Sequence, residues 1–268
     1  MRVIKSSGET ERFSSRKIYR GVLRAGGSRK LARATVDYLK KRMRQDMPTE
    51  RILEIVLTYL KKDPGVAARY DLKRAIMSLG PSGFPFEVYF AQILKEYGYE
   101  AKTSNMIKGK RVTHEVDIVA KKKNVYMIEC KYHNRTGKYT GLKEAMYTYA
   151  RFLDIKKKKF DYSWLATNTH CSGNAIRYSN GVGQKITSWK YPKGESLKEL
   201  IEKKGLYPIT IIKYVSPDVK HKLYSARIML AKDLKNYTIK ELVRKTGISE
   251  KRLKMIVSEA EGIYSVKN

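Results

Sequence analysis

The residues best suited to chemistry lie between Val112 and His133, where the chain reads VTHEVDIVAKKKNVYMIECKYH. Two runs of alternating apolar residues flank a Lys-Lys-Lys-Asn segment, a pattern that predicts a β-hairpin. Asp117 falls in the first strand, and Glu129 and Lys131 fall two residues apart in the second. Because side chains alternate between the two sides of a strand, Glu129 and Lys131 should point the same way. Two carboxylates and an ammonium group held together can bind a divalent metal ion against a phosphate.

The alternative is that these charges form an ordinary solvated face of a strand. Their neighbours argue against it, because Asp117 lies between Val116 and Ile118, and Glu129 follows the apolar run VYMI. Near-continuous apolar runs indicate strands that are covered on both faces. A carboxylate in such a strand is unfavourable unless it is paired or bound to a cation. The sequence therefore predicts a functional cluster in this hairpin.

Asp117, then eleven residues, then Glu129-Cys130-Lys131 resembles the PD-(D/E)XK nuclease signature in its Mrr-like restriction-endonuclease branch. The flanks HEVDIVA and IECKYH and the later segments TNTHCSGNAI and ITSWKYP resemble the same branch. The resemblance implies that Asp117, Glu129 and the backbone carbonyl of Cys130 bind one Mg²⁺ or Mn²⁺. It also implies that Lys131 positions the attacking water or stabilises the charge that develops at phosphorus.

A fourth candidate is Glu87, which lies at the edge of the apolar stripe of a helix expected over residues 86–97. A lone Glu near a helix start is usually a favourable charge at the positive end of the helix dipole. In the resembling family a Glu on this helix points toward the metal site. That likeness implies that Glu87 holds a second metal ion or orients a metal-bound water.

Two histidines flank the motif, and both leave two interpretations open. His114 and His133 could each touch a phosphate or shuttle a proton, or could be satisfied by solvent at a strand end. Asn168 and Thr169, at the end of an expected strand, are candidates for contact with the substrate backbone.

The charge balance indicates the kind of partner. Of 268 residues, 57 are basic and 26 acidic, which gives a net charge of +31, and residues 1–80, 81–215 and 216–268 each carry part of the surplus. Such an excess predicts contact with nucleic acid, because basic residues that neutralise phosphates release counterions. A thermophilic surface would instead balance Lys with Glu. DNA is the expected partner, with RNA left open.

The sequence predicts a cytoplasmic location and no contact with membranes. Its start, MRVIKSSGETERF, lacks the apolar stretch of a signal peptide, and its apolar runs are too short to span a bilayer. Cys130 and Cys171 are the only cysteines, so no disulfide framework is expected.

Gly- and Pro-rich breaks at residues 79–83 and 215–217 predict three domains: 1–80, 81–215 and 216–268. The middle domain shows helix and strand patterns in the order α-β-β-β-α-β, with the first strand near residues 99–103, which predicts a mixed sheet flanked by helices. The fold class is therefore α/β, or α+β over the whole chain. The basic run Lys156–Lys159 is interpreted as a solvated helix end or a phosphate contact.

The first domain should open with a hairpin, VIKSSGETERF, followed by helices, the first capped by Ser14 or Ser15. This segment resembles the ATP-cone, the nucleotide-sensing domain of ribonucleotide reductases. The resemblance implies binding of ATP or dATP, with Lys5 facing phosphates and four residues near the adenine or ribose: Val3, Glu11, Ser14 and Lys17. The alternative is a basic helical domain that binds DNA.

The last domain is expected to be a small all-α unit. Its pattern predicts one helix over Leu223 to Leu234 and then two helices separated by Thr246-Gly247-Ile248-Ser249. The pair resembles a helix-hairpin-helix or helix-turn-helix unit, which can present backbone N–H groups to a DNA phosphate. Small helical hairpins also serve as interaction modules.

Together these features predict a metal-dependent DNA endonuclease whose activity responds to ATP or dATP. A homodimer would fit, because cutting two strands takes two active sites. One alternative is a non-catalytic, nucleotide-gated DNA-binding regulator. Another is a structure-specific nuclease that acts on repair intermediates or junctions.

Overall fold

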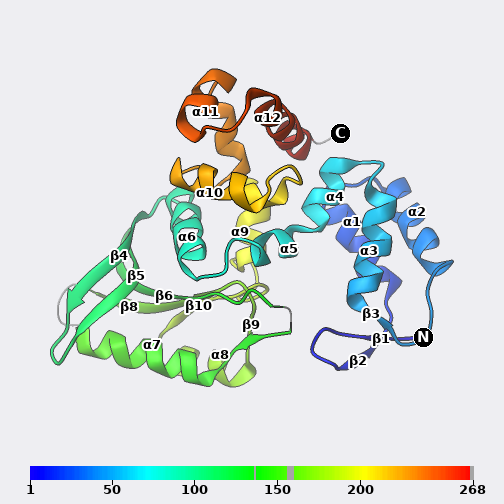
Figure 1. The fold of residues 1–268 in the computed structure, drawn as a ribbon. Coiled ribbons are helices and arrows are strands. Elements are labelled where there is room, and N and C mark those ends of the chain that lie inside the picture. The colour runs from blue at the N-terminus through cyan, green and yellow to red at the C-terminus, as the bar shows by residue number, and fades with distance from the viewer. Residues whose placement is uncertain (136, 156–159, 266–268) are drawn as a thin grey trace. The chain divides into compact units, whose positions relative to one another are not determined.

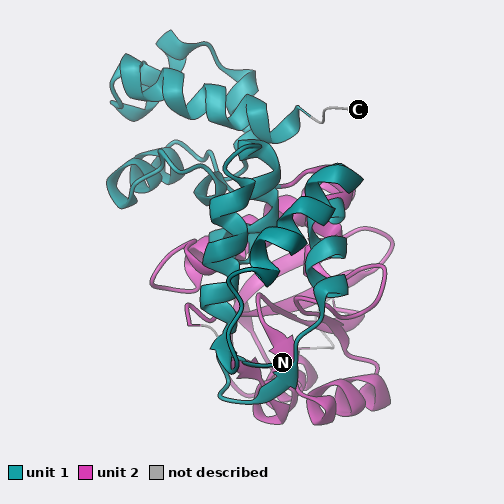
Figure 2. Ribbon diagram, turned by 90° about the vertical axis from the view of Figure 1, so that its right-hand side faces the viewer, with its two compact units in different colours: residues 1–76, 207–268 teal, residues 77–206 magenta. Residues whose placement is uncertain are grey.

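A computed structural model describes residues 1–135, 137–155 and 160–265 of the chain (Figure 1). The run Lys156–Lys159 is outside the described residues. The chain divides into two compact units, one of residues 1–76 and 207–268 and one of residues 77–206 (Figure 2). The division into three domains at residues 80 and 215 stays a prediction.

The unit of residues 77–206 is built on a mixed sheet with strand order β10-β8-β6-β5-β4. Strands β4, β5 and β6 are successive antiparallel neighbours, whereas β6, β8 and β10 run parallel. The bounds are β4 Glu100–Lys108, β5 Thr113–Lys121, β6 Val125–Lys131, β8 Tyr162–Thr167 and β10 Lys185–Thr187. This is the mixed sheet that the sequence predicted.

Helices cover both faces of this sheet, with α6 on one side and α7 and α8 on the other (Figure 1). Helix α6 packs Phe90 edge-on against the buried Trp164 of β8, with ring centroids 5.8 Å apart. Helix α7 buries Phe152 with Val116 and Met127 of the central hairpin. The bounds are α6 Phe84–Glu96, α7 Leu142–Ile155, α8 Gly173–Val182 and α9 Leu197–Lys204, with short strands β7 Tyr139–Thr140 and β9 His170–Cys171.

The expected hairpin, helices and strands of this unit all form, and the first strand is longer than expected. The pattern predicted it at residues 99–103, whereas β4 continues to Lys108. Ser104 has a φ of 54°, and the register of β4 against β5 skips that residue. The register is the same on both sides of this position, with Thr103 opposite Ile118 and Asn105 opposite Val116, so no residue is inserted and the alternation continues. The second half of β4 has no fully buried residue, so it lacks the apolar alternation by which a strand is recognised in a sequence.

The other unit begins with a small sheet of order β2-β1-β3 and a bundle of helices. Val3, Val22, Leu39, Val56 and Leu60 belong to its shared hydrophobic core. Ser14 stands at the expected cap position of α1, but its hydroxyl makes no capping hydrogen bond. The bounds are β1 Arg2–Ile4, β2 Thr10–Arg12, α1 Ser15–Arg24, α2 Arg29–Lys40, β3 Met47–Pro48, α3 Thr49–Leu60, α4 Pro64–Tyr70 and α5 Leu72–Met77.

The same unit contains the last segment of the chain, whose helix α12 packs against α4. Gly247 has a φ of 62° and ends α11, and Ser249 precedes α12 without a side-chain capping bond. The bounds are η2 Ile209–Ile211, α10 Pro217–Ser225, η3 Ala231–Asn236, α11 Ile239–Thr246 and α12 Glu250–Tyr264. None of the described helices is long and apolar enough to span a membrane.

The predicted helix from Leu223 to Leu234 is wrong. Helix α10 ends at Ser225, Arg227 has a φ of 62°, and residues 228–231 are all buried. Pro208 and Leu230 form an isolated antiparallel bridge, and Ile209 N donates to Met229 O at 2.8 Å. Four consecutive buried residues suit an extended segment enclosed on both sides, so tertiary packing replaces the helix.

Candidate active site

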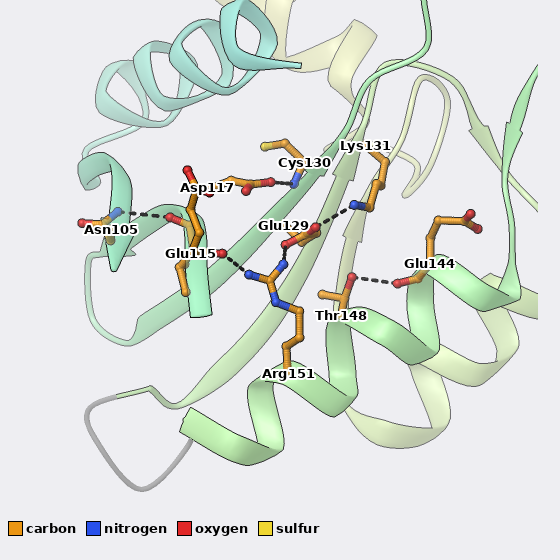
Figure 3. A network of polar contacts seen from close by, with 10 residues as sticks. Asn105, Glu115, Asp117, Glu129, Cys130, Lys131, Glu144, Thr148 and Arg151 are labelled. Carbon is orange, nitrogen blue, oxygen red and sulfur yellow. Dashed lines mark hydrogen bonds and ion pairs between the residues drawn. The ribbon is translucent and has the colours of Figure 1, made fainter. Parts of the chain in front are cut away.

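Strands β5 and β6 bring the predicted carboxylates together at one end of the central hairpin (Figure 3). The paired register ends with Ile118 opposite Ile128, so Asp117 and Glu129 are the next residue on each strand. The Cys130 N–H donates to Asp117 Oδ2 at 2.7 Å. The Asp117 carboxylate thus accepts from the β6 backbone just past the last registered pair.

Glu129 and Lys131 share one side of β6, as the period of the strand predicted. Lys131 Nζ donates to Glu129 Oε1 at 2.7 Å. Glu129 is only 3% exposed, whereas Lys131 is partly exposed. A buried carboxylate is stable in this setting because a cation lies directly against it.

Sequence reasoning missed Arg151, which lies on α7 and faces the same carboxylate. The Arg151 guanidinium donates to Glu129 Oε2 and to the backbone carbonyl of Glu115 (Figure 3). Both oxygens of Glu129 therefore have a cationic partner, one from its own strand and one from a helix. The AMYTYARFL pattern of α7 marks an amphipathic helix, but no local signal pairs its Arg with the hairpin.

An exposed aromatic side chain lies beside these cations. Tyr147, one turn before Arg151 on α7, is 55% exposed. Its ring centroid is 5.5 Å from the Arg151 guanidinium carbon and 5.9 Å from Lys131 Nζ. These are cation–π distances, and sequence reasoning did not single out Tyr147.

Glu87, in the first turn of α6, belongs to the same electrostatic cluster. Burial raises the pKa of Glu87 to about 7, and the nearby charges of Asp117, Glu115 and Glu129 add to the shift. Burial also raises the pKa of Asp117 to about 6, and the charge of Glu129 adds to this shift. The hydrogen bond from the Cys130 N–H acts in the opposite direction and lowers the pKa. Such shifts arise when carboxylates lie close together in a partly desolvated site, as Glu87, Asp117 and Glu129 do here.

Lys131 and Cys130 have different environments despite being neighbours. Burial alone would lower the pKa of Lys131, but its hydrogen bond with Glu129 and the nearby carboxylates shift the pKa upward. Lys131 is therefore a cation here rather than a ready proton acceptor. Burial raises the pKa of the Cys130 thiol well above its usual value, which makes the thiol a packing group.

The donor chemistry of the cluster fits a hard divalent cation. Among residues 1–135, 137–155 and 160–265, no three His, Cys, Asp or Glu side chains lie close enough to hold a metal ion. The expected site needs only two such side chains and one carbonyl oxygen. Within the described part of the chain, Asp117 Oδ1 and the Glu87 carboxylate accept no hydrogen bond. They are available oxygen ligands, the kind that Mg²⁺ and Mn²⁺ prefer.

The histidines and the Asn-Thr pair have structural partners. His114 Nε2 lies 2.9 Å from Asp154 Oδ2, and His133 Nε2 lies 3.2 Å from the Thr140 hydroxyl. Asn168 is fully buried, accepts from His133 N and donates to His133 O. Thr169 is 2% exposed. The hydrogen bonds of Asn168 support the chain just after β6, and a substrate contact by Asn168 or Thr169 stays a prediction that their burial disfavours.

The residues expected to bind nucleotide gather on and beside the β1–β2 hairpin. Lys17 Nζ donates to both carboxylate oxygens of Glu11 at 3.0 Å, and Lys5 Nζ lies 3.6 Å from Glu11 Oε2. The hydrogen bond from Lys17 outweighs burial and lowers the pKa of Glu11. Ser14 stands between hairpin and helix at the start of α1, whereas the Val3 side chain is in the core, 3% exposed.

Comparison with known proteins assigns each segment of the chain. Residues 1–77 match the ATP cone domain, residues 80–201 the restriction endonuclease family, and residues 207–264 the family described as AF1548-like, C-terminal. An "Uncharacterized protein" of Archaeoglobus fulgidus is 43% identical over 174 residues, which are 65% of this chain and 98% of that protein. The chain belongs to the AF1548-like family.

A solved structure supports the same assignment. The crystal structure titled "Protein of Unknown Function AF1548" is 41% identical, with a TM-score of 0.62, and the match covers 67% of this chain and 97% of that one. The expected fusion of an ATP-cone, an Mrr-like restriction-endonuclease domain and a helical C-terminal unit is confirmed. This AF1548-like protein therefore combines a nuclease-type domain with a nucleotide-binding type of domain.

Proposed function

We propose that this AF1548-like protein is a metal-dependent endonuclease that hydrolyses phosphodiester bonds in DNA, with ATP or dATP as regulator. The observation that carries the proposal is the cluster of Asp117, Glu129 and Lys131 on two adjacent strands, with Glu87 facing it from α6. This set of groups occurs within a domain of restriction-endonuclease type.

Each residue of the cluster has a distinct role in this proposal. Asp117, Glu129 and the Cys130 carbonyl would hold Mg²⁺ or Mn²⁺, which when bound supplies Lewis-acid polarisation of the phosphate and acidifies water. Lys131 remains protonated beside Glu129, so its role is to stabilise negative charge on the phosphoryl oxygens. Glu87, with a pKa near 7, is suited to hold or accept the proton of a water at neutral pH.

The test is cleavage of labelled duplex, flap, junction and single-stranded DNAs with Mg²⁺ or Mn²⁺, with and without ATP. We expect cuts with the native chain and none with Lys131→Ala or Glu129→Gln. Lys143→Ala, which removes an exposed lysine of α7, is the matched control and should cut normally. Cleavage that survives in Glu129→Gln would contradict the assignment of the active site. The panel of DNAs would also distinguish a restriction enzyme from a nuclease that acts on repair intermediates or junctions.

A second function is favoured by one specific observation. Both Glu129 oxygens are bonded to cations, Lys131 and Arg151, which already neutralise the carboxylate without a metal ion. A non-catalytic, nucleotide-gated DNA-binding regulator would keep this arrangement. Electron paramagnetic resonance, which measures Mn²⁺ binding, separates the two functions. If the chain is an endonuclease, the native chain should bind Mn²⁺ and Asp117→Asn should weaken that binding. If it is a regulator, no specific Mn²⁺ binding is expected.

Regulation and assembly belong to the same proposal. Lys5, Glu11, Ser14 and Lys17 form the surface that would bind ATP or dATP, supported by the match to the ATP cone domain. A homodimer would supply the two active sites needed for cutting both strands. Sedimentation with and without DNA tests the dimer, and nucleotide titration of Lys5→Ala with Lys17→Ala tests the hairpin.

A further inference from the structure

A cavity of about 920 Å³ lies within the unit of residues 1–76 and 207–268 and shares no residue with the nuclease cluster or the β1–β2 hairpin. One wall is Gly26 after α1 with Gly65 and Arg69 of α4, and the other includes Lys213 and one face of α12. The first and last segments of the chain therefore build this cavity together.

Two glycines permit the close approach that forms it. A Cβ at Gly65 would lie 2.3 Å from the Gly262 carbonyl oxygen, so only glycine lets α4 and α12 meet there. Gly26 has a φ of 80°, and a Cβ at Gly26 would lie 2.9 Å from an Arg69 guanidinium nitrogen. The backbone thus approaches the Arg69 side chain closely where that side chain lines the cavity.

Arg69 is a buried cation that forms no ion pair with any carboxylate in the described part of the chain. It is 7% exposed, and its guanidinium donates to the backbone carbonyls of Ala25 and Ile263. Among the residues that the structure describes, no carboxylate lies within ion-pair distance of it. Burying a guanidinium without a counter-charge is unfavourable, so a ligand that supplies the charge would stabilise this site.

The other charges around the cavity leave its surplus positive. Lys62, Lys213 and Lys254 line it beside Arg69. Its two acids are committed to backbone N–H groups, Asp63 to Val66 N and Glu259 to Lys213 N. Lys254 pairs with Glu250, but both side chains are more than half exposed, and such a pair is easily exchanged.

We propose that this cavity binds a small phosphate-bearing molecule, of the nucleotide or pyrophosphate class, with its anionic group against Arg69. The volume is within the range of small-molecule sites, roughly 300–1,000 Å³. Tyr214 and Met255 add apolar surface at the rim, where a base or other non-polar part would lie. A ligand held between α4 and α12 would fasten the ATP-cone segment to the C-terminal segment. This second site is independent of the nuclease proposal.

The test is isothermal titration calorimetry of the full chain with pyrophosphate and with ATP, in a Lys5→Ala/Lys17→Ala background that disables the hairpin. In that background Lys213→Glu with Lys254→Glu should weaken binding of at least one probe by at least about tenfold, because two cations near the anion are reversed. The matched control is Lys251→Glu, one turn earlier on α12 and outside the cavity, which should bind as the background does.

A second variant fills the cavity without changing its charge. Ser258→Trp places a large side chain at an exposed lining position and should abolish binding while the unfolding midpoint stays unchanged. Equal binding in all variants, or no binding of either probe to the background chain, would overturn the proposal. The proposal would also be overturned if the Lys213→Glu/Lys254→Glu and Ser258→Trp variants bound pyrophosphate and ATP normally but bound duplex DNA more weakly. The phosphate that the cavity recognises would then be that of DNA.

Discussion

At the scale of single residues, Glu129 explains how the cluster is held before any metal ion arrives. Its oxygens accept from Lys131 and Arg151 while the side chain is almost fully buried. Removing Arg151 leaves that carboxylate with one cation in a water-poor place. Arg151→Ala should therefore destabilise the chain by about 3 kcal/mol, the order expected when one partner of a buried pair is removed.

Urea unfolding of Arg151→Ala and the native chain measures this difference. Saturating Mg²⁺ should narrow it, because an ion bound at Asp117 and Glu129 would take over the counter-charge. Lys143→Ala, on the exposed side of the same helix, serves as the control and should unfold like the native chain. If Mg²⁺ left the difference unchanged, the ion would not share Glu129 with Arg151.

Glu87 predicts a pH dependence of stability. Its pKa is about 7 in the folded chain, mainly because of burial, against an ordinary value of 4.5. The folded state thus binds this proton more tightly, so the stabilisation is complete below the ordinary pKa and is lost as pH rises through about 7. Glu87→Gln keeps the shape without the charge and should match the native chain at low pH but exceed its stability at high pH.

Chemical unfolding at about pH 5 and about pH 8.5 checks this, since these values bracket the folded pKa. Glu100→Gln, at an exposed position of β4 away from the cluster, should show no pH-dependent gain. A gain for Glu87→Gln that is equal at both pH values would mean that charge in the cluster is not its cause.

How far the site could be predicted from sequence depends on how local its contacts are. Asp117, Glu129 and Lys131 lie in one hairpin, so strand periodicity and resemblance were enough to bring them together. Arg151 reaches Glu129 only because α7 packs its apolar side on β5 and β6. No pattern within α7 encodes that contact, because helix spacing specifies a face and not what the face covers.

At the scale of elements, the β4–β5 turn is held by one side chain of α7. Asp154 accepts from Arg111 N at 2.9 Å, Val112 N at 3.2 Å and His114 Nε2 at 2.9 Å. A Cβ at Gly109 would lie 2.0 Å from Asp154 Oδ2, so the backbone must pass directly over the carboxylate. Asp154 therefore fastens the start of β5, the strand that bears Asp117.

Asp154→Ala should loosen this turn while the sheet remains folded. Amide exchange at Arg111 and Val112 should accelerate by about tenfold or more, because each amide loses its acceptor. Amides of β8 are the internal reference and should exchange as before. Unchanged exchange at Arg111 and Val112 would mean that another acceptor replaces Asp154.

The break between α10 and η3 shows why one predicted helix failed. Residues 223–234 have helical spacing, but residues 228–231 are buried on all sides and pair with residues 207–209. Arg227 makes the turn with a φ of 62°, a conformation unfavourable for a residue with a Cβ. Nothing in the local sequence announces this turn, since glycine, the usual residue there, is absent.

Arg227→Gly should consequently stabilise the chain, because glycine adopts a positive φ without strain. The greater freedom of glycine in the unfolded state offsets part of this gain, so the net stabilisation should be roughly 0.5 kcal/mol. Thermal unfolding of this variant measures the gain. Arg177→Gly, inside α8, is the opposite control and should destabilise by about 1 kcal/mol. A loss of stability in Arg227→Gly would mean that the Arg side chain itself holds the turn.

At the scale of the whole molecule, a charge of +31 over 268 residues predicts how the chain should meet DNA. Neutralised phosphates release counterions, so affinity should fall steeply with salt, by a factor of about 10³ between 50 and 200 mM for roughly six phosphate contacts. Fluorescence anisotropy of a labelled duplex at several salt concentrations gives the slope directly.

Charge and catalysis are separable in this measurement. Glu129→Gln changes one buried residue among many surface cations, so it should keep the native salt slope while abolishing cleavage.

Tyr147→Ala should weaken binding of single-stranded DNA by about 1–3 kcal/mol, the range for loss of one base-stacking aromatic. It should leave the salt slope unchanged, because it removes no charge. A shallow slope in the native chain would contradict a role for the basic surplus in DNA binding. The positive charge would then serve the smaller anions expected at the hairpin and at Arg69.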